Sequence, residues 1–328
     1  LYFEYCELTN IKQNEKKVEN EMNSKVLILF FADLNNKNVV IRELNKKYNI
    51  HSTCVFRSVG VVGSIIRKLH FKSRLPGFEF WFHNWKYNLE EYSTVICIAS
   101  HYSPRVLRWI NRKNSKIRLI NYFWDSISIS GYPVVEDKYE NWSFSYNDCI
   151  NYNLRYNPQF FIETVKLPKE DILYDITYVG ADREGKLSER SELLYHYYNE
   201  FLKRGINFYL YYVSNTKIFP ENLLQKDQIS EEEFHRISAQ GRVILDIVEP
   251  NVQWMTLRPL LALSNKKKII TNNSSIIFEP FYNKENIFIL GVDNLDDLNE
   301  FIIKDFVQLD KDVLKQYEAK SWIERFNA

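Results

Sequence analysis

The chain has 328 residues, enough for two domains of ordinary size, and its 43 Lys and Arg residues are balanced by 42 Asp and Glu residues. The formal charge of +1 argues against a general nucleic-acid-binding protein, which would carry a strong basic excess. A hydrophobic content of 45% and an aromatic content of 16% support packed cores and exclude a chain that is disordered throughout.

The cysteines and the apolar runs bear on the compartment. Cys6, Cys54, Cys97 and Cys149 show no metal-binding spacing, which favours buried thiols in a reducing cytosol over disulfides. No apolar run reaches the roughly 18 residues needed to span a bilayer, and no signal-peptide pattern is present at the start. We therefore expect a soluble, cytoplasmic protein, with residues 1–21 as a loose extension.

Strand and helix patterns alternate along the chain, as in parallel α/β domains. A basic, aromatic stretch over 65–86 and an aromatic stretch over 141–162 show no clear period. In the first half we predict strands at 25–31, 51–57, 93–99 and 117–122 and helices at 36–48 and 104–111.

The pattern restarts after a charged, linker-like segment at 163–171. In the second half we predict strands at 174–179, 208–213, 243–248, 268–271 and 287–290, and helices at 188–204, 231–238, near 256, at 295–303 and at 313–326. The predicted domains are therefore 22–165 and 166–311, each Rossmann-like, with a terminal helical segment, 312–328, that packs toward the first domain.

The run from Val243 to Asn273 is the most informative part of the sequence. It predicts a strand–loop–helix–strand unit in which Thr256 lies at the start of the helix and Arg258 in its first turn. Helix amides and a guanidinium at the carboxyl ends of parallel strands favour the binding of an anionic diphosphate. Gly180, at the end of another predicted strand, is a further candidate for the donor site, and the loop after it adds two cations, Arg183 and Lys186.

Each of these residues also has an ordinary structural interpretation. The charges of the loop after Gly180 can neutralise one another in solvent, and Arg258 can pair with Glu249 or another acid. Glu279 follows the last strand of the unit, where its carboxylate is either a ligand for a sugar or ribose hydroxyl or a surface acid.

Three groups follow predicted strands of the first domain: Asp33, His101 and Asp125. A side chain at such a position can act as the general base for an acceptor hydroxyl, and His has the most suitable pKa. The alternative is that they are structural loop residues. The cations and aromatic residues of 67–85 likewise fit an anionic membrane surface or sugar stacking, or simply a solvated loop and a buried core.

Several common motifs are missing from the sequence. There is no glycine-rich dinucleotide fingerprint, no phosphate-binding loop, no His-Glu-x-x-His and no nucleophile elbow. Their absence weakens simple dehydrogenase, NTPase, zinc protease and serine hydrolase interpretations.

Three segments give the chain a family resemblance. Trp142 to Phe161 resembles the end of the first domain, Tyr174 to Gly180 the opening of the second domain, and Ile244 to Asn272 the donor-side signature of bacterial glycosyltransferases of GT-B fold. These enzymes occur among capsule and lipopolysaccharide biosynthesis proteins. The resemblance implies two facing Rossmann-like domains and a metal-independent transfer of sugar from a nucleotide-diphosphate donor, with no other cofactor.

The implied acceptor is a glycan or a lipid-linked glycan, with peripheral contact at the inner membrane face and no nucleic-acid partner. The chain also departs from the family pattern: Trp254 replaces a Gly, Leu261 a donor-binding Glu and Ser264 a Gly. These departures keep two alternatives open. One is a non-catalytic protein of the same fold that binds glycans or partners, and the other is a nucleotide-sugar epimerase.

Overall fold

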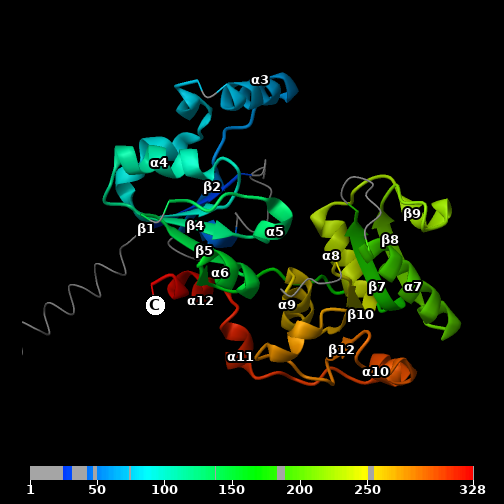
Figure 1. The fold of residues 1–328 in the computed structure, drawn as a ribbon. Coiled ribbons are helices and arrows are strands. Elements are labelled where there is room, and N and C mark those ends of the chain that lie inside the picture. Colours follow the sequence, from blue (N-terminus) through cyan, green and yellow to red (C-terminus); the bar gives the residue numbers. More distant parts are fainter. Residues whose placement is uncertain are drawn as a thin grey trace, which may run out of the picture. The chain divides into compact units, whose positions relative to one another are not determined.

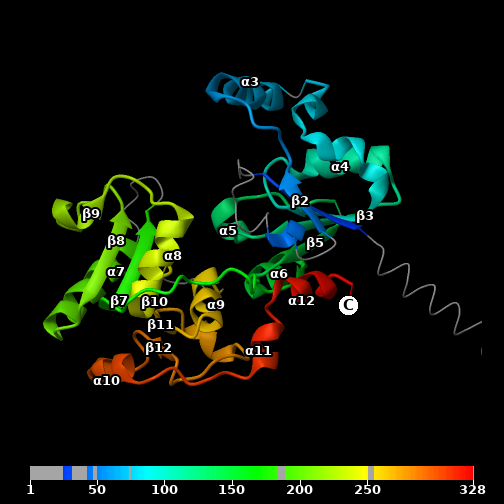
Figure 2. The ribbon, with the colours of Figure 1, turned by 180° about the vertical axis from the view of Figure 1, so that it is seen from behind.

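A computed structural model divides the chain into two compact units: Leu1–Phe144 with Asp148–Tyr156, and Ser145–Asn147 with Asn157–Ala328. Figures 1 and 2 show the elements from opposite sides. The structure describes residues 25–31, 43–46, 50–73, 75–136, 138–182, 189–249 and 255–327.

The first unit contains a six-stranded sheet in which all neighbouring strands are parallel. Its strand order is β2-β1-β3-β4-β5-β6. The chain passes from β1 to β2 on one side and then crosses to β3 on the other side of β1, so the order of the strands reverses between β1 and β3. The strands are β1 (Lys25–Phe30), β2 (Ile50–Cys54), β3 (Tyr92–Ile98), β4 (Arg118–Phe123), β5 (Glu140–Ser143) and β6 (Arg155–Tyr156).

The helices of the first unit include parts of the two stretches, 65–86 and 141–162, that showed no clear period in the sequence. Residues 78–91 form three short 3-10 turns, η1 (Phe78–Trp81), η2 (Asn84–Tyr87) and η3 (Leu89–Glu91). The α-helices are α3 (Val61–Lys72), α4 (Ser103–Lys113), α5 (Ile127–Ser130) and α6 (Tyr146–Tyr152).

The core of the first unit shows how the aromatic stretch is used. Trp85 and Phe82 are buried, and their rings lie 5.9 Å and 5.2 Å from the ring of Trp109 on α4. The same cluster includes Val95 and Cys97 of β3. Most of the aromatic side chains of 78–85 therefore belong to the core between the sheet and α4, which is the more common use of such a cluster.

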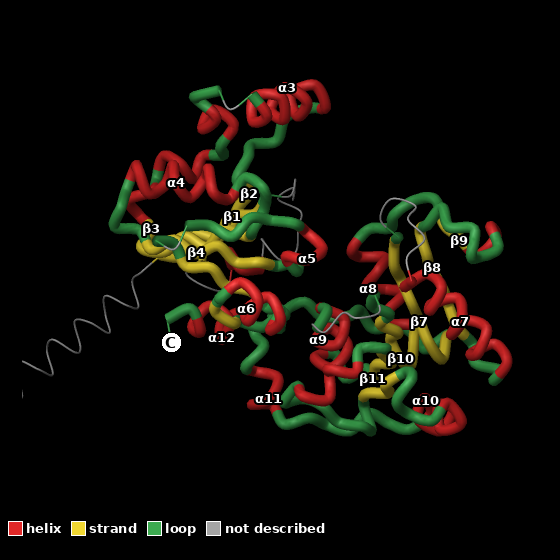
Figure 3. The backbone as a smooth tube through the Cα atoms, viewed as in Figure 1, coloured by secondary structure: helices red, strands yellow, loops and turns green. Residues whose placement is uncertain are grey.

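The second unit contains another six-stranded parallel sheet, in the order β12-β11-β10-β7-β8-β9. Figure 3 shows its strands alternating with helices along the chain. The strands are β7 (Tyr174–Ala181), β8 (Phe208–Val213), β9 (Leu224–Gln225), β10 (Gly241–Asp246), β11 (Lys268–Thr271) and β12 (Ile287–Ile289). The helices are α7 (Glu189–Lys203), η4 (Glu221–Leu223), α8 (Glu231–Gln240), α9 (Leu257–Ser264), η5 (Ser274–Phe278), η6 (Leu295–Asp297) and α10 (Leu298–Ile303).

Alternating residues of this sheet pack against different helices. Val243 and Leu245 of β10 share a cluster with side chains of α7 and α10, whereas Ile244 lies in a second cluster with Leu260 and Leu263 of α9. Because successive side chains of a strand point to opposite faces, α9 lies on the face opposite α7 and α10. This arrangement confirms the predicted α/β class with two Rossmann-like sheets.

The end of the chain forms two helices where the sequence pattern predicted one. α11 (Lys311–Lys315) and α12 (Ala319–Arg325) are separated at Tyr317, whose carbonyl accepts a hydrogen bond from the Phe161 amide, while the Phe161 carbonyl accepts one from the Ala319 amide. This pairing satisfies backbone groups outside the helices. Trp322 of α12 is buried, with its ring 4.5 Å from that of Phe160. The packing of the segment 312–328 toward the first domain stays a prediction.

No helix among the described residues is both long enough and apolar enough to cross a membrane.

Candidate functional site

The second sheet has a topological switch point between β7 and β10. These strands are hydrogen-bonded neighbours, and the chain leaves β7 toward β8 on one side and returns to β10 on the other. In open α/β sheets, ligands bind in the crevice outside the carboxyl ends of the strands at such a point. The residues that follow β7 and β10 therefore define the candidate site.

Asp246 organises this edge of the sheet. It is the last residue of β10 and is only 1% exposed. Its carboxylate accepts hydrogen bonds from Thr256 Oγ1 at 2.9 Å, Arg258 Nη1 at 3.1 Å and Thr271 Oγ1 at 3.4 Å. A buried carboxylate needs such partners, because burial without them costs several kcal/mol. The sequence pattern had placed Asp246 in an apolar strand without giving it a function.

Arg258 connects the two strands of the switch point. Besides its bond to Asp246, its Nη2 donates to the carbonyl of Val179 in β7 at 2.6 Å, and the guanidinium lies 5.2 Å from the ring centre of Tyr178. These contacts use two of the five guanidinium N–H groups, and the side chain stays 23% exposed. Arg258 is therefore paired with an acid, which was its structural interpretation. It is also a fixed and partly exposed cation.

A second cation, which the sequence reasoning missed, lies at the start of α7. The Nη2 group of Arg190 donates to the Ala181 carbonyl at the end of β7, and the backbone amide of Arg190 donates to Glu249 at 3.1 Å. Arg190 Nε and the Tyr178 hydroxyl are buried without a hydrogen-bond partner among the described residues. Buried polar groups usually have partners, so these two atoms are exceptions to the general rule.

The loop after β10 is held in place from β11. The side-chain amide of Asn272 accepts a hydrogen bond from the Val248 amide at 2.8 Å and donates to the Val248 carbonyl at 3.0 Å. Asn272 therefore acts as a substitute strand partner for residue 248. Glu249, the next residue, is thereby directed to the N-terminal turn of α7, where a carboxylate is favoured.

Gly180 serves the packing of Tyr178. A Cβ atom at Gly180 would lie 2.6 Å from the Tyr178 hydroxyl oxygen, a distance that real Cβ atoms essentially never show. Tyr178 is 1% exposed, so its ring cannot move away into solvent. The packing of Tyr178 thus gives a steric reason for glycine near the end of β7. The sequence had made the same Gly180 a candidate for donor binding.

Glu279 lies just after η5, beyond the carboxyl end of β11. It is half-buried, and its Oε2 accepts a hydrogen bond from the Tyr317 hydroxyl at 2.5 Å. Burial raises the pKa of this carboxyl, and the bond from Tyr317 opposes the rise. The structure therefore places Glu279 against the C-terminal segment, in contact with the turn between α11 and α12.

The first unit places two of its three candidate residues at one sheet edge. His101 follows β3 and Asp125 follows β4, and these strands are parallel neighbours. Both side chains are exposed, and the His101 ring lies edge-on, 5.0 Å from that of Tyr132. Asp33, Arg183, Lys186 and Trp254 lie outside the described residues.

The chemistry of the second sheet's edge suits an anion. Two guanidinium groups, Arg190 and Arg258, and the starts of α7 and α9 lie around the switch point, where helix amides and arginine forks favour phosphate oxygens. The described residues contain no group of three His, Cys, Asp or Glu side chains arranged to hold a metal ion.

Comparison with known proteins gives a likeness in structure alone. No protein-family model matches the chain, and no curated protein matches it. The structure is similar to that of Anabaena Alr3699/HepE in complex with UDP and glucose, with a TM-score of 0.56, 9% identity and coverage of 93% of this chain and 98% of that one. It is also similar to sucrose-phosphate synthase from Thermosynechococcus elongatus, with a TM-score of 0.55, 12% identity and coverage of 93% and 97%.

A third similar structure, that of TarM, has a TM-score of 0.47 and 11% identity, and the chain spans about half of its length (71% of this chain, 54% of TarM). At 9% and 12% identity, the likeness to the first two structures shows the fold. It confirms the predicted resemblance to proteins of GT-B fold, with two Rossmann-like units.

Proposed function

We propose that the protein is a glycosyltransferase that takes a sugar from a nucleotide-diphosphate donor held by the second unit. The observation that carries the proposal is the position of Arg258, which is fixed by Asp246 and Val179 at the switch point and keeps N–H groups available. A guanidinium held in this way can bind a diphosphate without first losing side-chain freedom. One of the similar folds was crystallised with UDP and glucose, which supports a nucleotide-sugar donor.

The leaving diphosphate would be stabilised by the cations and helix amides of the second unit. Arg190 and Arg258 would bind its oxygens directly, and the N-terminal amides of α9 would add a favourable dipole. Arg183 and Lys186, which precede α7 in the sequence and lie outside the described residues, are proposed as further donor ligands. Thr256 and Asp246 would act through Arg258 by fixing its orientation.

In this proposal the first unit holds the acceptor. His101 is the proposed general base for the acceptor hydroxyl, and Asp125 at the same sheet edge is another candidate. Asp33, which lies outside the described residues, is a third candidate. The acceptor is proposed to be a glycan or a lipid-linked glycan of a surface polysaccharide. Glu279 is proposed to contact the donor from the end of β11, as a ligand for a sugar or ribose hydroxyl.

One observation favours a second candidate function, a non-catalytic protein of the same fold. Arg258 is bound to a buried acid, and Leu261, one turn later on α9, offers no carboxylate to a ribose. A chain that needs Arg258 only to hold Asp246 would keep the fold and bind no nucleotide.

The test is calorimetric titration of the chain with UDP, GDP, CMP, dTDP and their sugars, together with two matched Arg→Gln variants. Arg258→Gln removes the ion pair with Asp246 at the carboxyl ends of β7 and β10. Arg242→Gln removes a more exposed ion pair with Asp175 at the opposite ends of the same two strands. We expect one nucleotide to bind, about 10- to 100-fold more weakly to Arg258→Gln and equally well to Arg242→Gln.

The remaining outcomes separate the alternatives. No binding by the folded chain would favour the non-catalytic protein. Binding followed by conversion of the donor sugar without any acceptor would indicate an epimerase. Binding with release of nucleoside diphosphate in the presence of acceptor glycans would support the transferase.

A further inference from the structure

A pocket of the first unit lies between α4 and the turn that leads into η1. Its volume is about 600 Å³, which falls within the range of small-molecule sites, roughly 300–1,000 Å³. Arg105, Arg108, Arg112 and Lys113 of α4 line one side, and Leu75 and Pro76 line the other. Four cations of the lining therefore face one acid, Glu79, and such a lining suits an anionic ligand.

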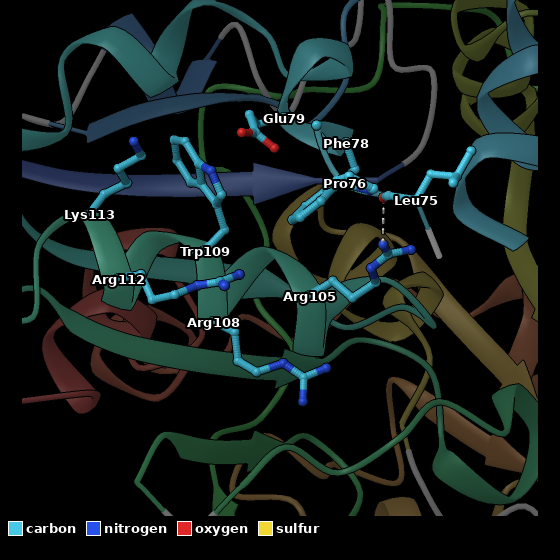
Figure 4. A pocket seen from close by; sticks show the side chains of 10 residues that line it. Leu75, Pro76, Phe78, Glu79, Arg105, Arg108, Trp109, Arg112 and Lys113 are labelled. Atoms are coloured by element: carbon cyan, nitrogen blue, oxygen red, sulfur yellow. Dashed lines mark hydrogen bonds between the residues drawn. The ribbon is translucent and has the colours of Figure 1, made fainter. Parts of the chain in front are cut away.

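The arginines of the pocket lie on one side of α4. At 100° per residue, Arg105, Arg108 and Arg112 fall within an arc of about 60°, and Figure 4 shows all three projecting from this helix. Arg108 and Arg112 are exposed, and like charges four residues apart destabilise a helix. α4 contains no acid to offset this repulsion, and the pair of Arg108 with Glu136, at 3.2 Å, is half-exposed and weak. A bound anion would relieve the repulsion, so a ligand explains the cluster better than the fold does.

The turn opposite the arginines is held in one conformation. The His70 ring accepts a hydrogen bond from the Trp81 indole through Nδ1 at 2.9 Å, which leaves the proton of the neutral ring on Nε2. Nε2 then donates to the Pro76 carbonyl at 2.9 Å. Gly77, the next residue, has a φ of 79°, a left-handed conformation that glycine adopts without strain. This wall of the pocket is therefore formed before any ligand arrives.

Arg105 connects the two walls of the pocket. Its Nη1 donates to the Phe71 carbonyl at 3.0 Å, its Nη2 donates to the Leu75 carbonyl at 3.5 Å, and its guanidinium lies 4.8 Å from the ring centre of Phe78. Phe78 and Trp109 line the pocket but are each only 7% exposed, so they form its apolar base. A pocket whose walls are already joined loses little freedom when a ligand binds, which favours affinity.

The pocket continues along α4, away from the sheet edge of the acceptor candidates. A second pocket of about 550 Å³ shares three lining residues with the first, Glu79, Trp109 and Lys113. It extends to Glu90, two residues before β3, and to Asn114, the residue after α4. These two residues lie near the amino ends of the strands, because a helix that follows one parallel strand returns the chain to the start of the next. The two pockets thus form one groove, the α4 groove, which is distinct from the carboxyl edge of the sheet.

We propose that the α4 groove binds a small soluble ligand that carries two or more phosphate groups beside an apolar or aromatic group, as a nucleoside di- or triphosphate does. Arg108, Arg112 and Lys113 bind the phosphate oxygens, and Leu75 and Pro76 contact the apolar part. Arg108 and Lys113 are separated by a rise of about 7.5 Å along the helix, so their charges converge on a short ligand rather than follow an extended acidic peptide. The proposal concerns the first unit alone and does not depend on the donor site.

The test is calorimetric titration of the full chain with ATP and with inorganic tripolyphosphate. We expect both to bind, and ATP to bind more tightly because of its base. The double variant Arg112→Gln/Lys113→Gln, whose changed side chains are exposed, should bind both at least about tenfold more weakly. Lys116→Gln/Lys320→Gln loses the same two charges from exposed lysines outside the groove and should bind like the parent chain. Arg258→Gln should also retain this binding, which separates the α4 groove from the donor site.

Chemical modification locates the bound ligand. Acetylation of Lys113 by a succinimidyl ester, followed by mass spectrometry, should be slower when ATP is present, whereas Lys116, which is also exposed, should react at an unchanged rate. No binding, equal weakening in the two double variants, or an unprotected Lys113 would overturn the proposal. So would the loss of all binding in Arg258→Gln, which would assign the anion to the donor site. Equally tight binding of a polyglutamate peptide would also overturn it, because the groove would then be a site for acidic peptides.

Discussion

At the carboxyl edge of the second sheet, Asp246 is 1% exposed and accepts hydrogen bonds from Thr256, Arg258 and Thr271. At the carboxyl edge of the first sheet, His101 and Asp125 are exposed. The two edges carry candidate residues on the same kind of parallel strand end, but one set is fixed in a buried network and the other is accessible to solvent.

This difference separates two ways of placing a functional group. A residue in a buried network is oriented before any ligand arrives, but it cannot be replaced without loss of stability. An exposed residue can be replaced at little cost to the fold, so its contribution to a reaction can be measured alone. The stability and the activity of variants should therefore change together in the second unit and separately in the first.

The largest expected effect is on activity in the first unit. If His101 is the general base, His101→Ala should lower sugar transfer by about 10²- to 10⁴-fold, with the free energy of unfolding nearly unchanged because the side chain is exposed. His196→Ala is the matched control, since His196 is also exposed and its ring also lies 5.0 Å from a tyrosine ring. Transfer is measured as release of nucleoside diphosphate. Equal activity of the two variants would show that His101 is not the general base. Asp125→Asn would then be the next variant to measure.

The next largest effect is on stability in the second unit. Asp246→Ala leaves the partly buried guanidinium of Arg258 without its acid, and we expect a loss of about 3–5 kcal/mol in the free energy of unfolding. Arg242→Ala, at the opposite edge, removes an exposed pair with a distance of 3.8 Å and should cost about 0–1 kcal/mol. Urea unfolding measures both. Similar losses in the two variants would show that the Asp246 network contributes no special stability.

The sequence predicted the longer strands well for a simple physical reason, whereas the short strands β5, β6 and β9 were not predicted. β8 and β11 occur at the predicted residues, and β1, β3 and β4 differ from prediction by one residue at one or both ends, because short apolar runs between polar segments mark buried strands clearly. The helix Val61–Lys72 was not predicted as such, since the aromatic and basic residues around it hide its period.

The candidate site was predictable only in part. Arg258 could be placed at a helix start from local sequence, but Asp246, inside an apolar run, gains its function from partners that are 10, 12 and 25 residues away. The bond between Arg190 and Glu249 spans 59 residues and leaves no local signal.

A smaller effect tests whether the second edge is as tightly packed as the Asp246 network indicates. Gly180→Ala would bring a Cβ to 2.6 Å from the Tyr178 hydroxyl oxygen, and we expect a loss of about 1–3 kcal/mol in the free energy of unfolding. Gly60→Ala is the control, because its Cβ would meet nothing within 4 Å. The double variant Gly180→Ala/Tyr178→Leu should lose less than the sum of its single changes. Strict additivity would mean that the ring of Tyr178 does not oppose a side chain at this position.

The smallest effect concerns Glu279, and it depends on pH. Because burial raises the pKa of this carboxyl in the folded chain, its contribution to stability is fully present below the unfolded value of about 4.3 and is lost as the pH rises through the folded value. The free energy of unfolding of the parent chain, relative to Glu279→Gln, should therefore fall as the pH rises above the unfolded value.

Glu300→Gln gives the opposite sign and serves as the control for Glu279. A hydrogen bond from Lys304 lowers the pKa of the exposed Glu300 carboxyl, so its small contribution is present above the unfolded value and is lost as the pH falls. Urea unfolding of both variants over the same pH range measures the difference. A pH-independent difference for Glu279→Gln would mean that its carboxyl is solvated like an ordinary surface acid. The end of β11 would then resemble the open edge of the first sheet, and the buried network would stop at Asp246 and Thr271.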